Sequence, residues 1–273
     1  MKLSEIQLKK QILIQGSSGT GKTHLEGTCA VTIPSVFITA DPDGLTTLQS
    51  MDILPETEFF LLENWDDSWK MVEQVTKHVM DKKPLAILLD DMTVFQDKAL
   101  LKGMFTPKDS DERRMNKDAF NAMVREQLAK GNRRLEQQAR GNANTAVDAV
   151  LRELVNLPAQ VKMVSVLESS REHPRSGQEH LFPLLEGGLR EELASRFSLV
   201  VNTFVAQYGS AMYYCATSRP NSRIETKDRF GNPRTWVNPT ASALIQHMNR
   251  KEAPETDLEK AIGIGTIASP GRS

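Results

Sequence analysis

A glycine-rich loop near the amino end constrains the fold of this chain more than any other feature. Residues 12–15 form a short apolar run that is typical of a buried strand, and Gly16 ends this run. The loop then reaches Gly-Lys-Thr at positions 21–23, where a helix is expected to begin. This is the Walker A pattern, with the strand before it and the helix after it that the motif requires. The chain is therefore predicted to bind a nucleotide.

Each residue type in the loop suits a triphosphate. Glycines allow successive backbone N–H groups to turn toward a phosphate, and the helix that follows adds its positive amino end. Lys22 is expected to reach the β- and γ-phosphates, and the Thr23 hydroxyl is expected to hold Mg²⁺. The residues predicted to bind ATP are Gly16, Ser17, Ser18, Gly19, Thr20, Gly21, Lys22, Thr23 and His24.

Apolar runs alternate with helical patterns along the first part of the chain. A helix is expected where Trp69, Val72, Val75 and Val79 recur at helical spacing. This alternation predicts an α/β fold, with a mostly parallel sheet and helices on both of its faces. The runs that read as strands are residues 12–15, 36–40, 58–62, 85–89, 161–167, 199–205 and 212–217.

The domain boundaries follow from changes in composition. One P-loop domain is expected over residues 1–250, with a helical insertion at about 102–158 that includes a helix over 146–157. The polar segment at residues 251–273 is expected to be a flexible tail.

Carboxylates follow two of the predicted strands. Asp90 comes directly after the apolar run 85–89, as in a Walker B strand, and is expected to hold Mg²⁺ opposite Thr23. Hydrolysis also requires a carboxylate that polarises the attacking water. Asp41 at the end of the second strand and Asp91 directly after Asp90 compete for this role, and Asp41 ranks first.

Charge is distributed so that any contact with nucleic acid must be local. The net charge is −1, which gives no overall attraction to DNA. A basic stretch at residues 102–140, with a loop at residues 171–177, is the predicted contact with single-stranded DNA. Acidic residues in the same stretch leave open an ordinary solvated helix face. The basic residues are Arg113, Arg114, Lys117, Arg125, Lys130, Arg133, Arg134 and Arg140.

The cysteines and the hydropathy indicate a compartment. Cys29 and Cys215 lie far apart and outside any metal-ligand spacing, which predicts a reducing cytoplasm without disulfides. Residues 1–6 lack the apolar core of a signal peptide. No apolar run approaches the ~18 to 20 residues of a membrane span. A cytoplasmic protein that does not enter a membrane is expected.

Three segments together, residues 16–23, 36–45 and 87–90, resemble the RecA-core ATPases of tailed phages. That family, often labelled phage nucleotide-binding or AAA proteins, includes Sak-type single-strand annealing proteins. Residues 183–187 resemble its Pro-x-x-x-Gly segment, and residues 226–231 resemble its Lys-x-Arg turn. The resemblance implies a RecA-like fold, ATP and Mg²⁺ as cofactors, and action on single-stranded DNA in recombination or annealing in the host cytoplasm. It also implies a homo-oligomer or filament, with a single-strand-binding protein as a further partner.

One departure from the family pattern concerns the second strand. The family usually has a glutamate followed by glycine there, whereas this chain has Asp-Pro-Asp-Gly at positions 41–44. The position of the catalytic carboxylate is therefore open.

Lys227 and Arg229 are two cations two residues apart, so they point the same way on an extended segment. In hexameric helicases of the DnaB type and in KaiC-like proteins, such a pair reaches the γ-phosphate bound by the neighbouring subunit. The pair is expected to complete a neighbour's catalytic site here. A solvated turn is the alternative, because the residues at 229–233 are turn-forming.

The predicted function is that of a Mg²⁺-dependent ATPase acting on single-stranded DNA. A small-molecule or nucleotide kinase is one alternative, although no arginine-rich lid is evident in the sequence. A nucleotide-gated assembly or helicase-loading protein with little catalysis is another. The short side chains of Asp41 and Asp91 favour this second alternative.

Overall fold

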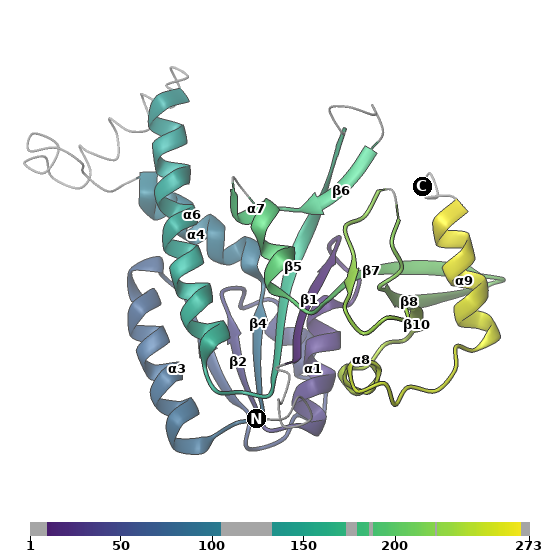
Figure 1. Ribbon diagram of the computed structural model, residues 1–273. Helices are drawn as coiled ribbons and strands as arrows, with labels where there is room; N and C mark the ends of the chain where they lie inside the picture. Colours follow the sequence, from purple (N-terminus) through teal and green to yellow (C-terminus); the bar gives the residue numbers. More distant parts are fainter. Residues whose placement is uncertain (1–9, 105–132, 173–178, 186–187, 222, 269–273) are drawn as a thin grey trace, which may run out of the picture.

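A mostly parallel sheet with helices on both faces forms the core of the protein (Figure 1). The computed structural model describes residues 10–104, 133–172, 179–185, 188–221 and 223–268 of the chain. The strands are β1 (Lys10–Gly16), β2 (Ser35–Thr39), β3 (Glu58–Leu61), β4 (Ala86–Asp90), β5 (Val161–Glu172), β6 (Glu179–Pro183), β7 (Leu199–Tyr208), β8 (Ala211–Thr217), β9 (Lys227–Asp228) and β10 (Thr235–Val237). The helices are α1 (Lys22–Thr32), α2 (Leu45–Leu48), α3 (Ser68–Lys82), α4 (Met92–Met104), α6 (Arg133–Asn156), α7 (Gly188–Leu193), α8 (Ala241–Met248) and α9 (Asp257–Ala268).

The strand order determines which loops meet. Along the sheet the order is β3-β2-β4-β5-β1-β7-β8-β10, with β6 paired to β5 and β9 paired to β7. The strands from β3 to β7 are parallel, and β8 and β10 add antiparallel pairs at one edge. β5 thus separates the Walker A strand β1 from the Walker B strand β4. The RecA-like P-loop α/β fold predicted from the sequence is confirmed.

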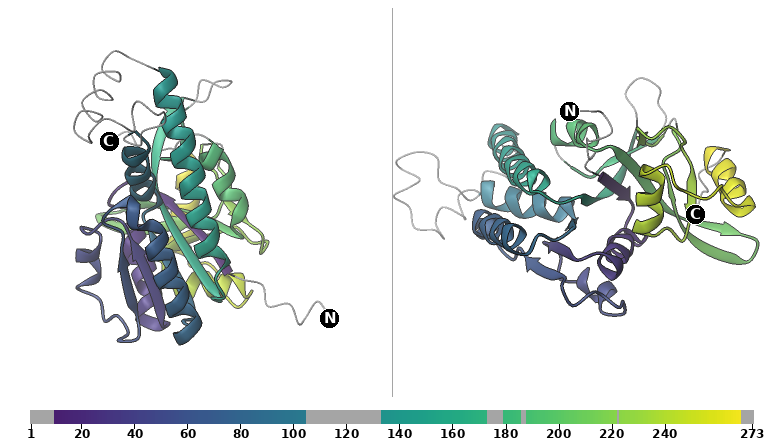
Figure 2. Two further views of the ribbon diagram at one scale, coloured as in Figure 1. Left: turned by 90° about the vertical axis from the view of Figure 1, so that its left-hand side faces the viewer. Right: turned by 60° about the horizontal axis from the view of Figure 1, so that its bottom comes forward.

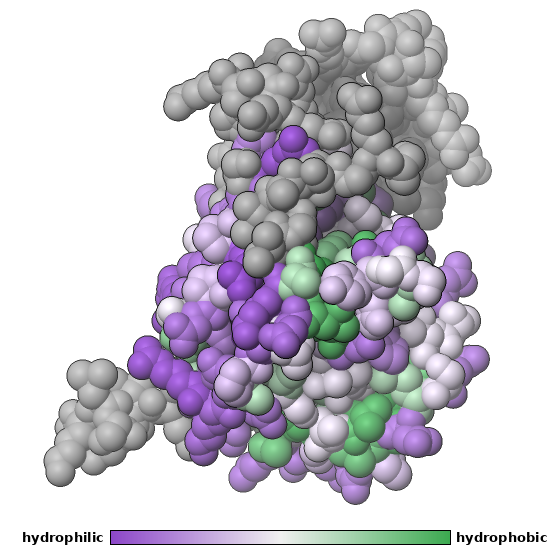
Figure 3. Space-filling view, turned by 90° about the vertical axis from the view of Figure 1, so that its right-hand side faces the viewer, coloured by the Kyte–Doolittle hydropathy of each residue, from purple (hydrophilic) through white to green (hydrophobic). Residues whose placement is uncertain are grey.

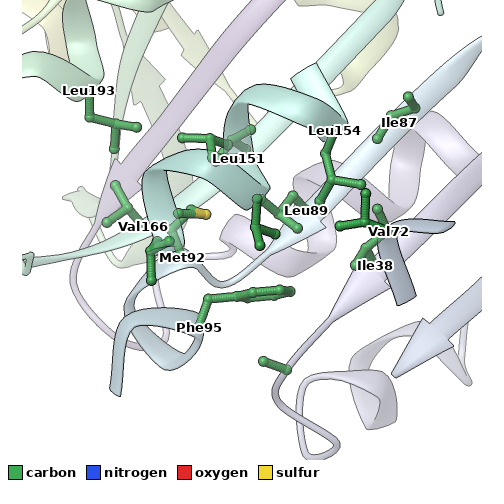
Figure 4. Close-up of a cluster of buried hydrophobic side chains, with 14 of the residues drawn as sticks. Ile38, Val72, Ile87, Leu89, Met92, Phe95, Leu151, Leu154, Val166 and Leu193 are labelled. Atoms are coloured by element: carbon green, nitrogen blue, oxygen red, sulfur yellow. The ribbon is translucent and has the colours of Figure 1, made fainter. Parts of the chain in front are cut away.

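The central strands are buried on both faces, so alternate residues feed two separate cores. Leu13 packs in one cluster with residues of α3, α4, α6 and α7, which Figure 4 shows in part. Its neighbours Ile12 and Ile14 pack in the other cluster, with α1 and α8. This is why the predicted strands read as continuous apolar runs rather than as alternating patterns.

Helix α3 corrects one sequence expectation. Its buried stripe is formed by Ser68, Met71, Val72, Val75 and Val79. Trp69 falls about 100° around the helix from Ser68, so it points away from this stripe. Its side chain is 53 % exposed rather than packed in the core.

The helical insertion differs in extent from the prediction. Helix α6 runs from Arg133 to Asn156, longer than the expected helix at 146–157, and packs against α3 and α4 (Figures 1 and 2). Residues 105–132 of the expected insertion lie outside the described residues.

The expected flexible tail is also different in the structure. Residues Asp257–Ala268 form α9, which packs against β10. Glu255 lies 2.6 Å from Arg219, and Glu259 lies 3.3 Å from Arg234. These ion pairs join the end of the chain to the edge of the sheet, which composition alone did not indicate.

The β7–β8 hairpin extends beyond its neighbours in the sheet (Figure 2). Its outer part exposes Val205, Tyr208, Met212 and Tyr214. Figure 3 views the side of β8 and α9, where hydrophobic surface is confined to small patches among hydrophilic residues. Among the described residues, no helix is both long and apolar enough to cross a bilayer.

Phe95 tests the core between α4, α6 and the sheet. Its side chain is 1 % exposed, so Phe95→Ala is expected to lower the free energy of unfolding by about 3 to 5 kcal/mol. The matched control is Trp69→Ala, which is expected to cost less than about 1 kcal/mol because the ring is half exposed. Urea unfolding measures both variants, and equal losses would contradict the assigned core.

Candidate functional site

The loop between β1 and α1 takes its shape from three glycines. A Cβ atom on Gly16 would lie 2.2 Å from the Thr203 hydroxyl of β7, so only glycine allows the two strands to approach this closely. Gly19 and Gly21 have φ angles of +75° and +86°. These left-handed conformations favour glycine over any other residue. The glycine spacing read from the sequence is therefore required by the backbone.

The amino end of α1 lacks a side-chain cap. Gly21 occupies the N-cap position and has no side chain that could accept a hydrogen bond from the helix. The first-turn N–H groups have no acceptor within the helix, and together with the helix dipole they favour a bound anion. Residues 18–24 line a cavity of about 560 Å³ at this point, and Gly16 and Ser17 lie outside its lining. His24 is exposed and lies on the wall of the cavity.

Lys22 lies beneath the loop. Its ammonium group donates hydrogen bonds to the carbonyl oxygens of Gly16 and Ser17, both at 3.0 Å. Burial lowers the pKa of Lys22, and the nearby carboxylates of Asp91 and Asp90 oppose this change. The lysine therefore closes the loop on itself and brings positive charge to the acidic end of β4.

Asp90 and Thr23 are in direct contact, as the two sequence motifs require. The Thr23 hydroxyl donates to Asp90 Oδ2 at 2.8 Å. The Ser165 hydroxyl of β5 donates to the other oxygen, Oδ1, at 2.6 Å. Burial raises the pKa of Asp90, although these two hydrogen bonds act in the opposite direction. Ser165 fixes the carboxylate, so that one oxygen faces Thr23.

The two candidates for the water-polarising carboxylate have different surroundings. Asp91 accepts a hydrogen bond from the Thr93 N–H at 2.7 Å, which caps the amino end of α4. Burial raises the pKa of Asp91. Asp41 is only partly buried, and both Asp41 and Asp91 line the cavity. A Cβ atom on Gly44 would lie 3.1 Å from Asp90 Oδ2 and 3.6 Å from Asp41 Oδ2. A glycine at position 44 therefore leaves open the space between these two carboxylates.

These residues fit a magnesium triphosphate. A hydroxyl and a carboxylate lie at the edge of an uncapped helix end, and Gly44 leaves room beside them. Among the described residues, no group of three or more His, Cys, Asp or Glu side chains forms a metal site. Mg²⁺ is bound in protein sites through one or two side chains together with phosphate oxygens and water, and Thr23 and Asp90 could supply such side chains.

The far wall of the cavity comes from residues that the sequence did not single out. Tyr214 of β8 lies beside the loop, with its ring carbon Cδ1 3.3 Å from the position of a Cβ on Gly21. Asn238, Pro239 and Thr240 complete this wall. The Asn238 N–H donates to the Tyr214 carbonyl at 2.6 Å. Only the return of β8 and β10 beside the loop identifies these residues, because no local motif marks them.

Glu168 is a second residue that the sequence analysis missed. It accepts a hydrogen bond from Asn202 of β7, and this bond crosses the end of β1, which lies between β5 and β7. Burial raises the pKa of Glu168 to about 7, while Asn202 and Lys22 act in the opposite direction. A signal was present, because Glu168 follows an apolar run as Asp90 does.

Lys227 and Arg229 do not line the cavity of their own chain. Lys227 belongs to β9, which Arg229 directly follows, and β9 pairs with β7 at Leu199 and Val200, whereas Gly16 pairs with Thr203. Three residues of strand put the pair about 10 Å from the loop along the strand direction. The Lys227 ammonium donates to the carbonyl oxygens of residues 194 and 195, at 3.2 and 2.9 Å. Burial and the neighbouring Arg229 lower the pKa of Lys227.

The predicted DNA contacts are largely beyond the described residues. Arg113, Arg114, Lys117, Arg125 and Lys130 lie outside them, as do residues 173–178. Arg133, Arg134 and Arg140 belong to α6, of which the structure describes only the backbone at these positions.

Comparison with known proteins gives a distant likeness. No family model matches the chain, and no curated protein matches it. Among solved structures, a KaiC-like protein from the hyperthermophilic archaeon Pyrococcus horikoshii OT3 is similar over 84 % of this chain and 89 % of its own. The two are 13 % identical, with a TM-score of 0.40. Because this similarity is low, the class of the protein is assigned from the strand order and the loop. They define a P-loop nucleotide-binding protein with a RecA-like fold.

Glu168 predicts a pH dependence of stability. Its pKa rises from 4.5 to about 7 on folding, so between these values the native state binds a proton that the unfolded chain releases. Stability is therefore full below pH 4.5 and falls as the pH rises through about 7. Glu168→Gln is expected to remove this loss, which amounts to about 3 kcal/mol at most. Urea unfolding from pH 5 to 8 measures it. Glu153→Gln, an exposed position on α6, is the control, and equal pH profiles for all three proteins would contradict the prediction.

Proposed function

We propose that this chain is an ATP-binding, Mg²⁺-dependent ATPase that acts on single-stranded DNA in phage recombination or annealing. The observation that carries its nucleotide chemistry is the 2.8 Å hydrogen bond between Thr23 and Asp90 at the edge of the Walker A loop. The action on DNA rests on the resemblance of the sequence to phage ATPases and on its basic stretch.

Each group in the cavity has a role in this proposal. The N–H groups of residues 18–24 and the Lys22 ammonium bind the phosphates, and Thr23 and Asp90 hold Mg²⁺ and its water shell. Bound Mg²⁺ would neutralise charge on the phosphate oxygens. Tyr214 and Asn238, on the opposite wall, receive the base and ribose.

Asp41 is the favoured carboxylate for polarising the attacking water. It lines the cavity, as Asp91 does, and its Oδ1 accepts one N–H bond, from Asp43 at 3.1 Å. Asp91, by contrast, already caps α4. Gly44 has no side chain to occupy the space between Asp41 and Asp90, where the attacking water would lie beside the Mg²⁺ site.

Thr23→Ala tests the nucleotide site directly. Loss of the hydroxyl removes the protein ligand that faces Asp90, so ATP affinity with Mg²⁺ is expected to fall at least about tenfold. The decrease is expected to be much smaller in EDTA. Titration with a fluorescent ATP analogue measures both. Thr32→Ala, at the other end of the same helix, is the matched control. Equal affinity of the Thr23 variant and wild type in Mg²⁺ would rule out this site.

Single-stranded DNA is expected to raise phosphate release. The affinity of the protein for the DNA should weaken steeply with salt. The logarithm of the association constant is expected to fall with the logarithm of the salt concentration, with a slope of about −0.7 for each phosphate contacted. The measurement is phosphate release with and without an unstructured oligonucleotide, at several salt concentrations. A matched amount of a polyanion without bases serves as the control. No response to DNA at low salt would contradict the proposed substrate, while ATP binding would stand.

Lys227 and Arg229 are proposed to complete the site of a neighbouring subunit. Both lie outside the cavity of their own chain, and no described residue accepts a hydrogen bond from the exposed Arg229 guanidinium. Cations supplied from outside the site stabilise the charge that develops on a transferred phosphoryl group. The active form would therefore be a homo-oligomer or filament, with a single-strand-binding protein as a further partner.

A nucleotide-gated assembly or helicase-loading protein is the second candidate. The capping role of Asp91 leaves a short aspartate, Asp41, as the base, which favours slow turnover. ATP-dependent oligomers without phosphate release would identify this function. A kinase is less favoured, because no arginine lies among the described residues that line the cavity.

A further inference from the structure

The buried acid Asp228 lies between Lys227 and Arg229 in the chain and holds this segment in place. Asp228 ends β9 with a buried side chain, whereas Lys227 before it is partly buried and Arg229 after it is exposed. Asp228 Oδ2 lies 2.7 Å from His247 Nε2 and accepts from the Ser218 hydroxyl at 3.0 Å. The side chains of Asp228 and His247 are each 1 % exposed. Both polar groups are thus removed from water.

His247 is itself held tightly. Its ring meets those of Phe230 and Trp236 edge to face, with centroids 6.3 and 5.2 Å apart. Its second nitrogen, Nδ1, lies 3.4 Å from Glu252 Oε1. The imidazole therefore has little freedom to move, and neither does the carboxylate that it contacts.

Helix α8 joins this buried pair to the nucleotide cavity. Thr240, which caps the helix, lines the cavity, and the next N–H, of Ala241, donates to Thr28 of α1 at 2.8 Å. His247 lies in the last turn of the same helix. An eight-residue helix is about 12 Å long and rigid over that length. One short element therefore contacts both the cavity wall and the base of the cation pair.

We propose that His247 and Asp228 are positioning residues, which hold Lys227 and Arg229 at the register needed to reach the phosphate bound by a second copy of this chain. The inference rests on the proposed in-trans role of the cation pair. It adds the residues that orient the pair and the helix that connects it to the subunit's own nucleotide site.

The pairing register of β9 is the physical reason for a polar anchor, which is the buried contact between Asp228 and His247. A slip of one residue in β9 would turn Lys227 and Arg229 inward and Asp228 outward. Apolar packing would stabilise the fold at least as well, because buried polar groups lose hydration. Three donors that meet one carboxylate tolerate no such slip, since Phe230 N–H also donates to Asp228 Oδ1 at 2.8 Å. Burial raises the pKa of Asp228, but the hydrogen bonds from His247 and Phe230 outweigh it and leave this pKa below its usual value.

His247→Leu and His247→Gln separate the positioning role from simple packing. Leucine fills the space without a donor, whereas glutamine keeps an N–H donor that can reach Asp228. Arg229→Ala is expected to lower ATP turnover on the order of 10³-fold. His247→Leu is expected to lower it at least about tenfold and to approach the loss seen with Arg229→Ala. ATP affinity is expected to stay at the wild-type value in both, and His247→Gln is expected to retain most turnover. His78→Leu on α3 is the control for loss of a histidine.

Mixing subunits tests whether the defect lies in the arm, which is the Lys227–Arg229 segment that reaches the neighbouring subunit. Lys22→Ala subunits have a damaged site and an intact arm, so adding them to His247→Leu subunits is expected to restore turnover. Adding Arg229→Ala subunits instead is expected to restore nothing, because both partners then lack a working arm. Restoration by both, or by neither, would overturn the positioning role.

The outcomes distinguish the two proposals. If Arg229→Ala loses turnover while His247→Leu keeps it, the anchor is wrong and the in-trans role stands. If Arg229→Ala keeps full turnover, the in-trans role fails and the anchor fails with it. If His247→Leu also loses ATP affinity, or if His247→Gln is as inactive as His247→Leu, the pair is structural only and the inference is overturned.

Discussion

The hydrogen bond from Thr23 to Asp90 is the interaction on which the site depends. It joins two groups that are 67 residues apart in the chain, one at the start of α1 and the other at the end of β4. Their distance is set by β5, which separates β1 from β4 and supplies Ser165 to hold the carboxylate. The parallel sheet brings the carboxyl ends of all three strands to one edge, where a ligand has access.

The same edge concentrates buried acids around one lysine. Burial raises the pKa of Glu26, Asp90 and Asp91, and Glu26 on α1 is fully buried without a described hydrogen-bond partner. Such groups cost stability, because each carboxylate loses its hydration. Lys22 offsets only part of this cost, since its own charge is also buried. Bound Mg²⁺ would reduce the repulsion between these acids and the phosphates of a nucleotide.

Sequence reasoning located the elements correctly where the signal is local. The loop, Asp90 and the parallel strands are each encoded by a short run with a required spacing, and the structure has the strands within a few residues of their predicted bounds. It failed where the partner is distant in sequence. Trp69 sits on a helical pattern yet faces solvent, and the segment around Glu255 looks like a tail until Arg219 and Arg234 are placed beside it. Glu168 had a readable signal, a carboxylate after an apolar run, that was not used.

The sequence by itself determined the class of fold and the phosphate-binding loop, because glycine spacing, strand hydrophobicity and the Lys-Thr pair act through local backbone geometry. Only the tertiary structure decided which of the two candidate acids caps α4, and which residues form the far wall of the cavity. It alone also brought His247 to the base of the Lys227–Arg229 pair. These features depend on the order of strands in the sheet and on the return of β8, β10 and α8 beside the loop. No short stretch of sequence encodes that arrangement, because it arises from packing between segments that are remote along the chain.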